Sequence, residues 1–437
     1  MLFKKEEKKK MTPAYNPYHF CQLANGLRVV HCQSASHVMY CGYALKVGAR
    51  DERPDEEGMA HYNEHMSFKG TERRTSTAVI NYLERVGGDL NAYTNKDATV
   101  YHAAVLCEYT PRAVDLLTDM VFHSTCPQTE MEKEVEVICD EIEGYNDTPA
   151  DLIYDQLEHL LFEGHALGHS TLGQPDTIRA YTHQQLMAFR QRLYQPERAV
   201  FFAYGDISFA RLVRLLSKAH GCPMPVLTAG GTVAVDALLP PSPSFAQLPM
   251  LPAYNPRHES EDKDTHQCHV ILGTRAYGLN HPRRMTLALV TNLLGGPGMS
   301  ARLNLSLRER HALVYTVESF FITYSDTGVW GVYFGCDPHD VSRCRRLVRR
   351  ELDRLIAAPL TSAQLRAAKQ QMKGQVAVAS DGHESYALDM AKLFLHQGKL
   401  KNVQRVLDAI DAITATDVQA VAQDLFAPDV LTEVVWH

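Results

Sequence analysis

Apolar and polar residues alternate along the chain in two rhythms, one with the period of a strand and one with the period of a helix. Runs rich in β-branched and aromatic residues predict strands over 28–34, 36–49 and 199–206, and we expect the first two to pair with each other. The stretch 90–106 predicts a hairpin with its turn at "NKD". Helical periodicity dominates from about residue 111 to residue 195. The first half is therefore predicted to mix helices with strands.

Proline, serine and glycine concentrate between residues 222 and 257, a composition that is typical of a linker between domains. Beyond it the pattern restarts, with a strand at 267–277, helices at 283–296 and 300–311, and long strands over 314–336. This order of elements resembles that of the first half, although residue identity between the halves is weak. We interpret the chain as a diverged duplication with an α+β fold.

A chain of 437 residues exceeds the size of one typical core and predicts two domains. The expected segments are a disordered tail over 1–17, an N-terminal domain over 18–220, a linker over 221–262 and a C-terminal domain over 263–437.

Composition and charge are those of an ordinary soluble protein. A formal charge of −7 gives no electrostatic reason to expect nucleic acid or a membrane as partner, and the basic run at 343–350 has the spacing of a solvated helix face. The ten cysteines are scattered without a CxxC pair, as expected of reduced thiols. No apolar h-region and no membrane-spanning stretch is found, so we expect a cytoplasmic location.

The candidate chemistry begins at "HYNEH", residues 61–65. Four positions apart on a helix, His61 and His65 share one face and can bind the same metal ion. Glu64 lies on that face too and could accept a proton from a zinc-activated water. The pattern H-x-x-E-H is the inverted form of the zinc-peptidase motif H-E-x-x-H, but so short a motif also arises by chance. Two ordinary histidines on a polar helix face are the alternative.

A catalytic zinc generally has three protein ligands, and the acidic helical stretch 129–147 offers carboxylates for the third. Most glutamates in such a run are solvated. Spacing alone does not choose among five of them, Glu132, Glu134, Glu136, Glu141 and Glu143.

The segment "VGARDERPDEEGMAHYNEHMSFKGT" resembles the active-site segment of the pitrilysin/insulinase family of zinc metallopeptidases. The resemblance extends over nearly the whole chain and includes residues 87–102, 165–182, 201–208 and 293–320. It is closest to the mitochondrial-processing-peptidase-like branch and its bacterial members. It implies two homologous domains, each a mostly antiparallel sheet packed with helices, and only the N-terminal one binds zinc.

The resemblance also implies roles for individual residues of the N-terminal domain. His61 and His65 match the family's histidine ligands of one zinc ion per chain, and Glu64 matches its general base. The third ligand is a glutamate 76 positions after the second histidine, which here is Glu141. Glu134 matches a carboxylate that orients the site from outside the ligand set.

Further matches concern the substrate. Asn91 and Ala92 match the edge strand along which the family adds a peptide substrate as an extra strand. Arg308 and Tyr315 match an arginine and a tyrosine of the C-terminal domain that face the site across a chamber. Without the surrounding match, this pair would be interpreted as a surface arginine and a core tyrosine. Asn63 departs from the family, which usually has an apolar residue there, and a buried Asn63 would need a hydrogen-bond partner.

These matches imply a zinc-dependent endopeptidase that hydrolyses short or unfolded peptides inside a closed chamber. Because the zinc motif and the Arg/Tyr pair occur on one chain, a homodimer is the simplest assembly, with a heterodimer of related subunits as the alternative. A non-catalytic assembly or substrate-recognition subunit is the rival function, although such subunits commonly lose part of the motif that this chain retains. A structural zinc site is disfavoured because no cysteine flanks the motif.

Overall fold

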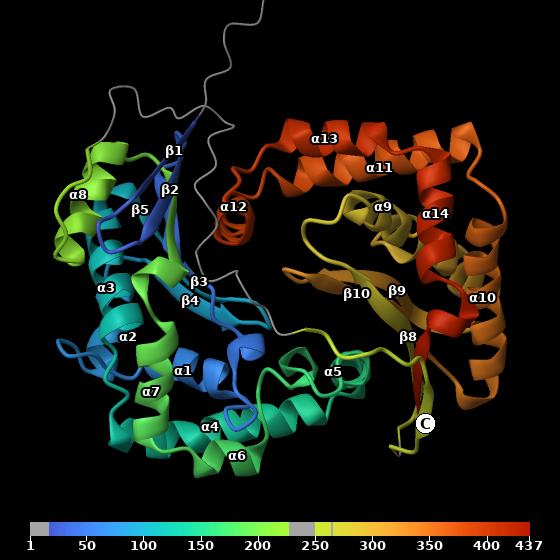
Figure 1. The fold of residues 1–437 in the computed structure, drawn as a ribbon, viewed down its shortest axis with the longest axis horizontal. Helices are drawn as coiled ribbons and strands as arrows, with labels where there is room; N and C mark the ends of the chain where they lie inside the picture. Colours follow the sequence, from blue (N-terminus) through green and yellow to red (C-terminus); the bar gives the residue numbers. More distant parts are fainter. Residues whose placement is uncertain (1–16, 227–249, 264) are drawn as a thin grey trace, which may run out of the picture.

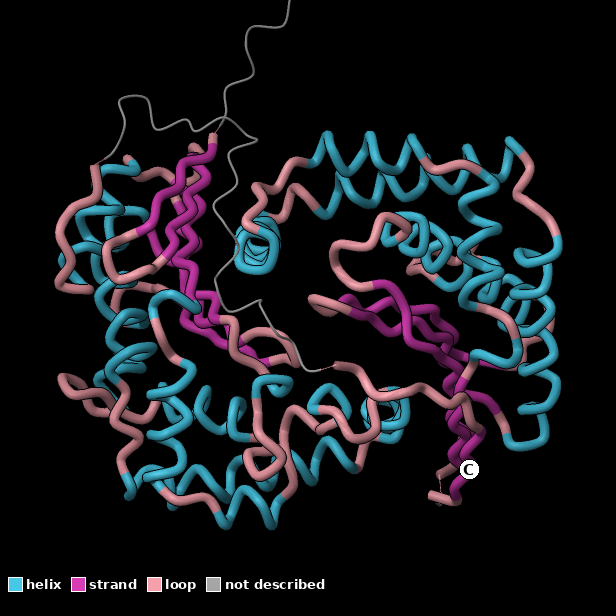
Figure 2. Tube along the Cα trace, in the orientation of Figure 1, coloured by secondary structure: helices cyan, strands magenta, loops and turns pink. Residues whose placement is uncertain are grey.

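The computed structural model describes residues 17–226, 250–263 and 265–437, which form two sheets with helices packed on both faces of each (Figures 1 and 2). All but the last residue of the tail expected over 1–17 lies outside the described residues, and so do residues 227–249 of the expected linker. No helix in these ranges is long and apolar enough to cross a membrane.

The N-terminal sheet has the strand order β1-β2-β6-β3-β5-β4. Its strands are β1 (Tyr18–Gln22), β2 (Arg28–Gln33), β3 (Val38–Leu45), β4 (Asp89–Thr94), β5 (Thr99–Leu106) and β6 (Ala199–Gly205). The hairpin expected over 90–106 is present as the antiparallel pair β4–β5. The expected pairing of β2 with β3 is wrong, because β6 lies between them, parallel to β2 and antiparallel to β3. The apolar β6 returns from the far end of the domain to complete the sheet, a non-local pairing that local pattern does not reveal.

The C-terminal sheet has the order β7-β11-β8-β10-β9. Its strands are β7 (His258–Glu261), β8 (Cys268–Tyr277), β9 (Val314–Thr323), β10 (Thr327–Cys336) and β11 (Thr432–Trp436). The short polar strand β7 lies within the range expected to be linker, and it pairs in parallel with β11. Its sequence, HESE, carries no strand pattern, which explains why the C-terminal sheet begins earlier than expected.

The helices follow the same order in both halves. The N-terminal half contains α1 (Met59–Ser67), α2 (Ser76–Glu84), α3 (Thr110–His123), α4 (Gln128–Asn146), α5 (Pro149–Leu161), α6 (Pro175–Ala180), α7 (His183–Leu193) and α8 (Phe209–Ala219). The C-terminal half contains α9 (Arg284–Gly295), the π-helical turn η6 (Asn304–Glu309), α10 (Val341–Ala357), α11 (Ser362–Ala379), α12 (His383–Gln397), α13 (Val403–Ala412) and α14 (Ala415–Leu425).

Strand pairing and helix order relate the two halves element by element, as expected of a duplication. The series β2-β6-β3-β5-β4 corresponds to β7-β11-β8-β10-β9, including one parallel pair in each. Five helices lie between β5 and β6, and five lie between β10 and β11, so that α3 to α7 correspond to α10 to α14. The helix α8, which follows β6, has no counterpart among the described residues.

Each half donates one helix to the sheet of the other (Figure 1). The helix α5 packs on the C-terminal sheet, where Ile153, Leu157 and Leu161 are buried against Ile271 and Val434. The helix α12 packs on the N-terminal sheet in the reciprocal position, and its buried residues lie against the far face of that sheet. These residues are Ala387, Met390, Ala391, Phe394 and Leu395. Neither sheet is therefore covered without the other half of the chain.

Polar contacts at the β4–β5 turn add a second connection between the halves. The Arg50 guanidinium donates to Asp97 at 2.7 Å and to both carboxylate oxygens of Asp326 at 3.0 Å. The backbone N–H of Ser325 donates to Asp97 at 2.8 Å. Because Asp97 lies in the "NKD" turn and Ser325 and Asp326 lie in the β9–β10 turn, these contacts fix two hairpins against each other.

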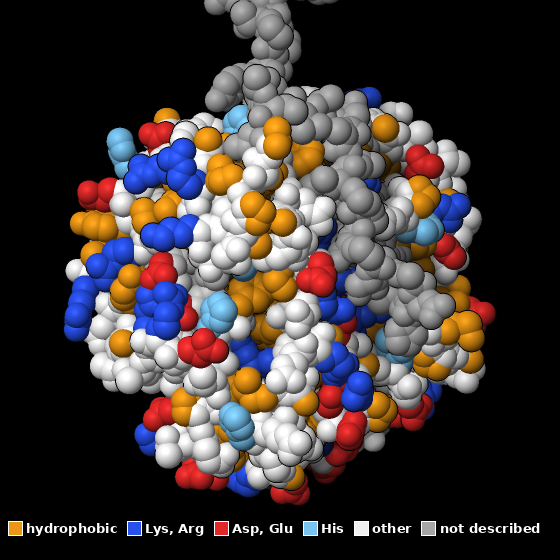
Figure 3. All heavy atoms as spheres, turned by 60° about the vertical axis from the view of Figure 1, so that its left-hand side comes forward, with side chains coloured by type: hydrophobic (Ala, Val, Ile, Leu, Met, Phe, Trp, Pro, Cys, Tyr) orange, Lys and Arg blue, Asp and Glu red, His pale blue; other side chains and the backbone are white. Residues whose placement is uncertain are grey.

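On the face shown in Figure 3, basic and acidic side chains are interspersed. This distribution fits the small net charge of −7 and shows no single-sign field on this face.

The exchange of α5 and α12 predicts that both halves unfold in one cooperative transition, because each core is completed by the other half. Replacing the fully buried Leu157 by alanine should destabilise the whole chain by about 2–5 kcal/mol. The control Val378→Ala removes a side chain that is 78% exposed on α11 and should change stability by at most about 0.5 kcal/mol. Calorimetry and guanidinium unfolding measure both effects, and two well-separated transitions in the wild type would contradict the prediction.

Candidate metal centre

The histidine-bearing helix α1 is held at both ends by buried side chains. Its N-terminus follows Gly58, whose φ of 82° suits glycine and whose Cα lies so close to Gly173 that a Cβ would approach it to 2.7 Å. The N-cap residue Gly58 has no side chain that could accept hydrogen bonds from the first N–H groups of the helix. The buried Glu52 carboxylate accepts from the N–H of Ala60 at 2.8 Å and from that of Gly58 at 3.2 Å instead.

At the other end of α1, the buried guanidinium of Arg190 from α7 serves as a hub. It donates to the carbonyl of Asn63 at 3.3 Å and to Ser67 Oγ at 3.0 Å. It also donates to the carbonyls of Met120 and Val121 near the end of α3, at 3.2 and 2.8 Å. Two helix C-termini thus share one cation, which sets the position of α1 against α3.

Three side chains converge at the exposed side of α1. The Nε2 atoms of His61 and His65 lie 3.2 Å apart. Glu141 reaches them from α4, with its carboxylate oxygens 3.8 Å from His61 Nε2 and 3.4 Å from His65 Nε2. The side chains of the two histidines are 9% and 20% exposed, whereas that of Glu141 is 46% exposed, so the cluster opens on the side of the carboxylate.

This arrangement has the chemistry and the dimensions of a zinc site. Two imidazole nitrogens and a carboxylate oxygen are preferred zinc ligands, with bond lengths of about 2.0–2.2 Å, so neighbouring ligand atoms of a tetrahedron lie about 3.3–3.6 Å apart. The three observed separations, 3.2, 3.4 and 3.8 Å, scatter closely around that value. The residues present therefore fit the ion, and three protein ligands leave one tetrahedral position for water.

The electrostatics of the cluster also favour a cation. Burial lowers the pKa of His61 to about 4, with a further lowering from His65, so the ring is neutral and has a free lone pair. Burial alone would lower the pKa of His65, but hydrogen bonds to Glu134 and Glu141 outweigh it and raise this pKa to about 9. The hydrogen bond to His65 keeps the pKa of Glu141 below its usual value. A proton on His65 thus occupies the place that a metal cation would take.

A second carboxylate orients one of the histidines from behind. Glu134, also on α4, lies 2.9 Å from Nδ1 of His65, which leaves Nε2 directed at the cluster. Lys69, just after α1, lies 2.5 Å from the other oxygen of Glu134. Burial by itself would raise the pKa of Glu134, but the hydrogen bonds to His65 and Lys69 outweigh it and lower this pKa. His61 has no such support, because its buried Nδ1 lacks a hydrogen-bond partner among the described residues.

Of the remaining motif residues, Glu64 is the candidate base and Asn63 is buried inside the domain. Glu64 is 8% exposed and accepts a hydrogen bond of 2.5 Å from Thr94 Oγ1 at the end of β4. Burial raises the pKa of Glu64, although the bond from Thr94 lowers it in part. The buried Asn63 has the hydrogen-bond partner that its burial was expected to require, because its Nδ2 donates to the Met59 carbonyl at 2.9 Å. Its Oδ1 has no partner among the described residues.

The strand β4, which carries Asn91 and Ala92, lies at the edge of the N-terminal sheet, and β5 is its one strand neighbour among the described residues. It packs beside α1, so the free edge of the sheet runs next to the histidine cluster. Asn91 is exposed, and its Oδ1 accepts from the N–H of Ala92 at 2.8 Å.

Arg308 and Tyr315 lie in the C-terminal half, away from this cluster. The Arg308 guanidinium sits 5.4 Å from the centre of the Tyr315 ring, so the two residues contact each other. Tyr315 is 80% exposed, which excludes the alternative of a core tyrosine. No hydrogen bond or ion pair between described residues joins either of them to His61, His65 or Glu141.

Four residues that hold the site together are not predicted by the sequence pattern. Lys69 and Thr94 lie within stretches that were already recognisable by resemblance, "HMSFKGT" and "LNAYT", and their contacts with Glu134 and Glu64 give them positioning roles. Glu52 and Arg190 carry no local signal, because the groups they bind are backbone atoms of a distant helix.

Two protein-family models match this chain. The model of the insulinase family (peptidase family M16) matches residues 28–175, and that of the peptidase M16 inactive domain matches residues 180–372. The chain is 30% identical to an "Uncharacterized zinc protease" of Bacillus subtilis over 94% of this chain and 95% of the relative. It is 32% identical to a zinc protease of Streptomyces coelicolor over 92% and 86% of the two chains. The chain is 28% identical to the mitochondrial-processing peptidase subunit beta of Bos taurus, over 91% of this chain and 80% of the relative.

Solved structures share the fold. A protease from Helicobacter pylori superposes with a TM-score of 0.85 at 21% identity, over 97% of this chain and 100% of that chain. A peptidase M16 inactive domain from Pseudomonas fluorescens gives the same TM-score at 17% identity, over 96% and 97%. The predicted architecture of two related α+β domains is confirmed.

The contacts of Glu134 predict a specific effect on metal binding. Glu134→Gln keeps the shape of the side chain but removes the charge that holds His65 and Lys69, so zinc affinity should fall about 10–100-fold. The control Glu132→Gln alters an exposed glutamate of the same helix and should leave the affinity unchanged. Competition with a chromophoric chelator measures both. Equal affinities of the two variants would show that Glu134 does not orient the site.

Proposed function

The chain belongs to the insulinase family of zinc metallopeptidases (peptidase family M16), and from this premise we propose that it is an endopeptidase that cleaves short or unfolded peptides at the α1–α4 cluster. The observation that carries the proposal is the convergence of His61, His65 and Glu141, with Glu64 beside them on the same helix. A non-catalytic subunit would not need the carboxylate of Glu64 next to a complete ligand set.

The proposed mechanism assigns each residue one task. His61, His65 and Glu141 would hold one zinc ion per chain, which supplies a Lewis acid and brings the pKa of a water to about 7. Glu64 accepts the proton of the attacking water and then delivers it to the leaving amine. Thr94 holds the Glu64 carboxylate through its 2.5 Å hydrogen bond, so this base is oriented before substrate arrives.

The free edge of β4 is the proposed binding site for the substrate backbone. A peptide added beside Asn91 and Ala92 would pair with the outward-facing N–H and C=O groups of the edge, would take the Ala92 N–H from Asn91 Oδ1, and would run past α1. Backbone pairing requires an extended segment, which is why short or unfolded peptides are the substrate class and folded proteins are not.

The proposed assembly is a homodimer that encloses the site. Arg308 and Tyr315 do not reach the cluster within one chain, and the exchanged helices α5 and α12 oppose a large closure between the two halves. A second subunit could present its exposed Tyr315 to the site, where the phenol would stabilise the developing oxyanion with Arg308 beside it. A related partner subunit would serve equally, as the name of the mitochondrial relative suggests.

The first test of this function is Glu64→Gln. Because the variant lacks the proton acceptor but keeps the ligands, it should retain bound zinc while peptide hydrolysis falls about 10²–10⁴-fold. Bound zinc is measured by atomic absorption, and cleavage of a mixed peptide library is followed by mass spectrometry. Zinc-loaded wild type and variant that are equally inactive would refute the proposal.

The second test concerns the shared site. Arg308→Ala and Glu64→Gln homodimers should both be weakly active, whereas a mixed dimer regains one intact site that combines Glu64 of one subunit with Arg308 of the other. Equimolar mixing should therefore restore about a quarter of the wild-type activity, since half of the dimers are mixed and each has one intact site of two. Subunit exchange is verified by fluorescence energy transfer; exchange without recovery of activity would argue against a site built from two subunits.

A further inference from the structure

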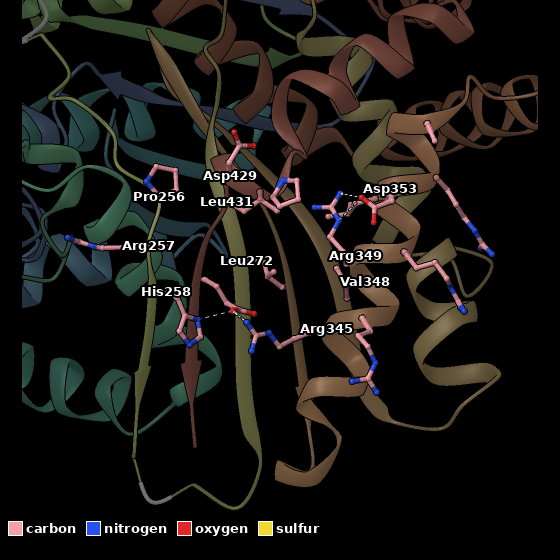
Figure 4. Close-up of a pocket in the computed structure, with 17 residues that line it drawn as sticks. Pro256, Arg257, His258, Leu272, Arg345, Val348, Arg349, Asp353, Asp429 and Leu431 are labelled. Atoms are coloured by element: carbon pink, nitrogen blue, oxygen red, sulfur yellow. Dashed lines mark hydrogen bonds and ion pairs between the residues drawn. The ribbon is translucent and has the colours of Figure 1, made fainter.

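A groove of about 1010 Å³ lies on the C-terminal half, between α10 on one side and the strands β7, β11 and β8 on the other (Figure 4). Its floor is apolar. The side chains that form it come from β8, α10 and the segment before β11, and they are Leu272, Val348, Leu352 and Leu431. The groove is formed entirely by the C-terminal half and by the residues just before β7, so none of its lining residues belongs to the metal centre.

The duplication explains why the groove exists. In the N-terminal half, Val29, Phe201 and Tyr43 form one row across β2, β6 and β3. The helix α8 packs into the same core with four buried apolar residues, Phe209, Leu212, Val213 and Leu216. No described helix takes this place in the C-terminal half. The groove beside α10 thus corresponds to a position that a single amphipathic helix fills in the other domain.

The row at the corresponding strands is partly polar. His258 and Glu433 are paired across β7 and β11, and Leu272 is paired with Glu433 across β11 and β8. The charge of the Glu433 carboxylate is already compensated by Arg345, and the same carboxylate lies 2.8 Å from His258 Nδ1. A buried carboxylate that is ion-paired with an arginine adds no net negative charge to the floor.

The rim is strongly basic. Six arginines line the groove against three carboxylates, and the arginines are Arg257, Arg345, Arg346, Arg349, Arg350 and Arg354. Arg349 is paired with Asp353 at 2.8 Å and Arg257 with Glu163 at 3.0 Å. Arg346 and Arg350 are exposed and have no carboxylate within 3.5 Å among the described residues. Since these two are four positions apart on α10, they present two guanidinium groups on one side of that helix.

We propose that this groove docks an acidic amphipathic helix of a partner protein. Leucine-type side chains of such a helix would cover the floor, as those of α8 do in the N-terminal half. Glutamates on its flanks would pair with the arginines of α10, and the same arginines would repel a basic helix. The metal centre is not part of this surface, so partner binding and peptide hydrolysis are separable properties.

The test uses a fluorescein-labelled, 18-residue helical peptide with leucines at i, i+3, i+4 and i+7 and glutamates at most other positions. Fluorescence anisotropy is measured with protein that carries Glu64→Gln, so that the peptide is not consumed. The double substitution Arg346→Glu/Arg350→Glu should weaken binding at least about tenfold, and raising the salt from 50 to 200 mM should weaken binding to the unsubstituted groove as well.

The control Arg343→Glu/Arg366→Glu introduces the same charge at exposed arginines outside the groove and should leave the affinity within twofold. A peptide with lysines in place of the glutamates should not bind. Three outcomes would each overturn the proposal. The first is equal binding of the peptide to the groove variant and the control variant, and the second is binding of anionic lipid vesicles but not of the peptide. The third is self-association of the chain that the groove substitutions abolish. In an otherwise wild-type chain, the groove substitutions should leave peptide hydrolysis unchanged, which separates this outcome from failure of the proposed function.

Discussion

The exchange of helices α5 and α12 is the constraint on which the rest of this structure depends. Each helix buries its apolar face on the sheet of the other half, at a gain of about 1.5–3 kcal/mol for each large side chain removed from water. A duplicated fold could pair its halves through a surface contact and let them move. Here separation of the halves would expose one face of each sheet to water, so the two halves behave as one body. The geometry of the metal centre therefore depends on both halves.

The consequence is visible at two positions of the site. The helix α4, which carries Glu134 and Glu141, runs directly into α5, so the anchoring of α5 on the C-terminal sheet fixes the far end of the ligand-bearing segment. The strand β4 ends at Thr94, which orients Glu64, and the turn that follows is bound to the β9–β10 turn through Asp97. Both the candidate third ligand and the orientation of the candidate base thus depend on residues of the other half of the chain, which are distant in sequence.

Local pattern predicts the elements of this fold well and their pairing less well. The helical spacing of His61 and His65 and the hairpin at "NKD" depend on neighbours in sequence, and both are present. The insertion of β6 between β2 and β3 is a non-local choice that apolar alternation does not encode. At the site, spacing left five glutamates of α4 open, and only the resemblance selected Glu141. The structure adds the physical distinction: Glu141 faces the histidines, whereas Glu132 and Glu136 are exposed on other faces of α4.

The two halves of the duplication differ in one helix, which carries polar site residues in the N-terminal half and apolar residues in the C-terminal half. The helix α9 corresponds to α1 in the order of elements, but its sequence, RMTLALVTNLLG, is largely apolar and has no histidine or carboxylate. In α1, by contrast, His61, Asn63 and Glu64 are buried, which costs free energy unless each group finds a partner. Thr94 binds Glu64, Glu134 binds His65, and Glu52 and Arg190 bind backbone groups of α1. Among the described residues, Asn63 Oδ1 and His61 Nδ1 are the side-chain atoms of this helix that lack a partner. A polar helix of this kind persists because the rigid frame around it positions every other donor and acceptor, and the half that lacks such a helix is free to keep an ordinary apolar core.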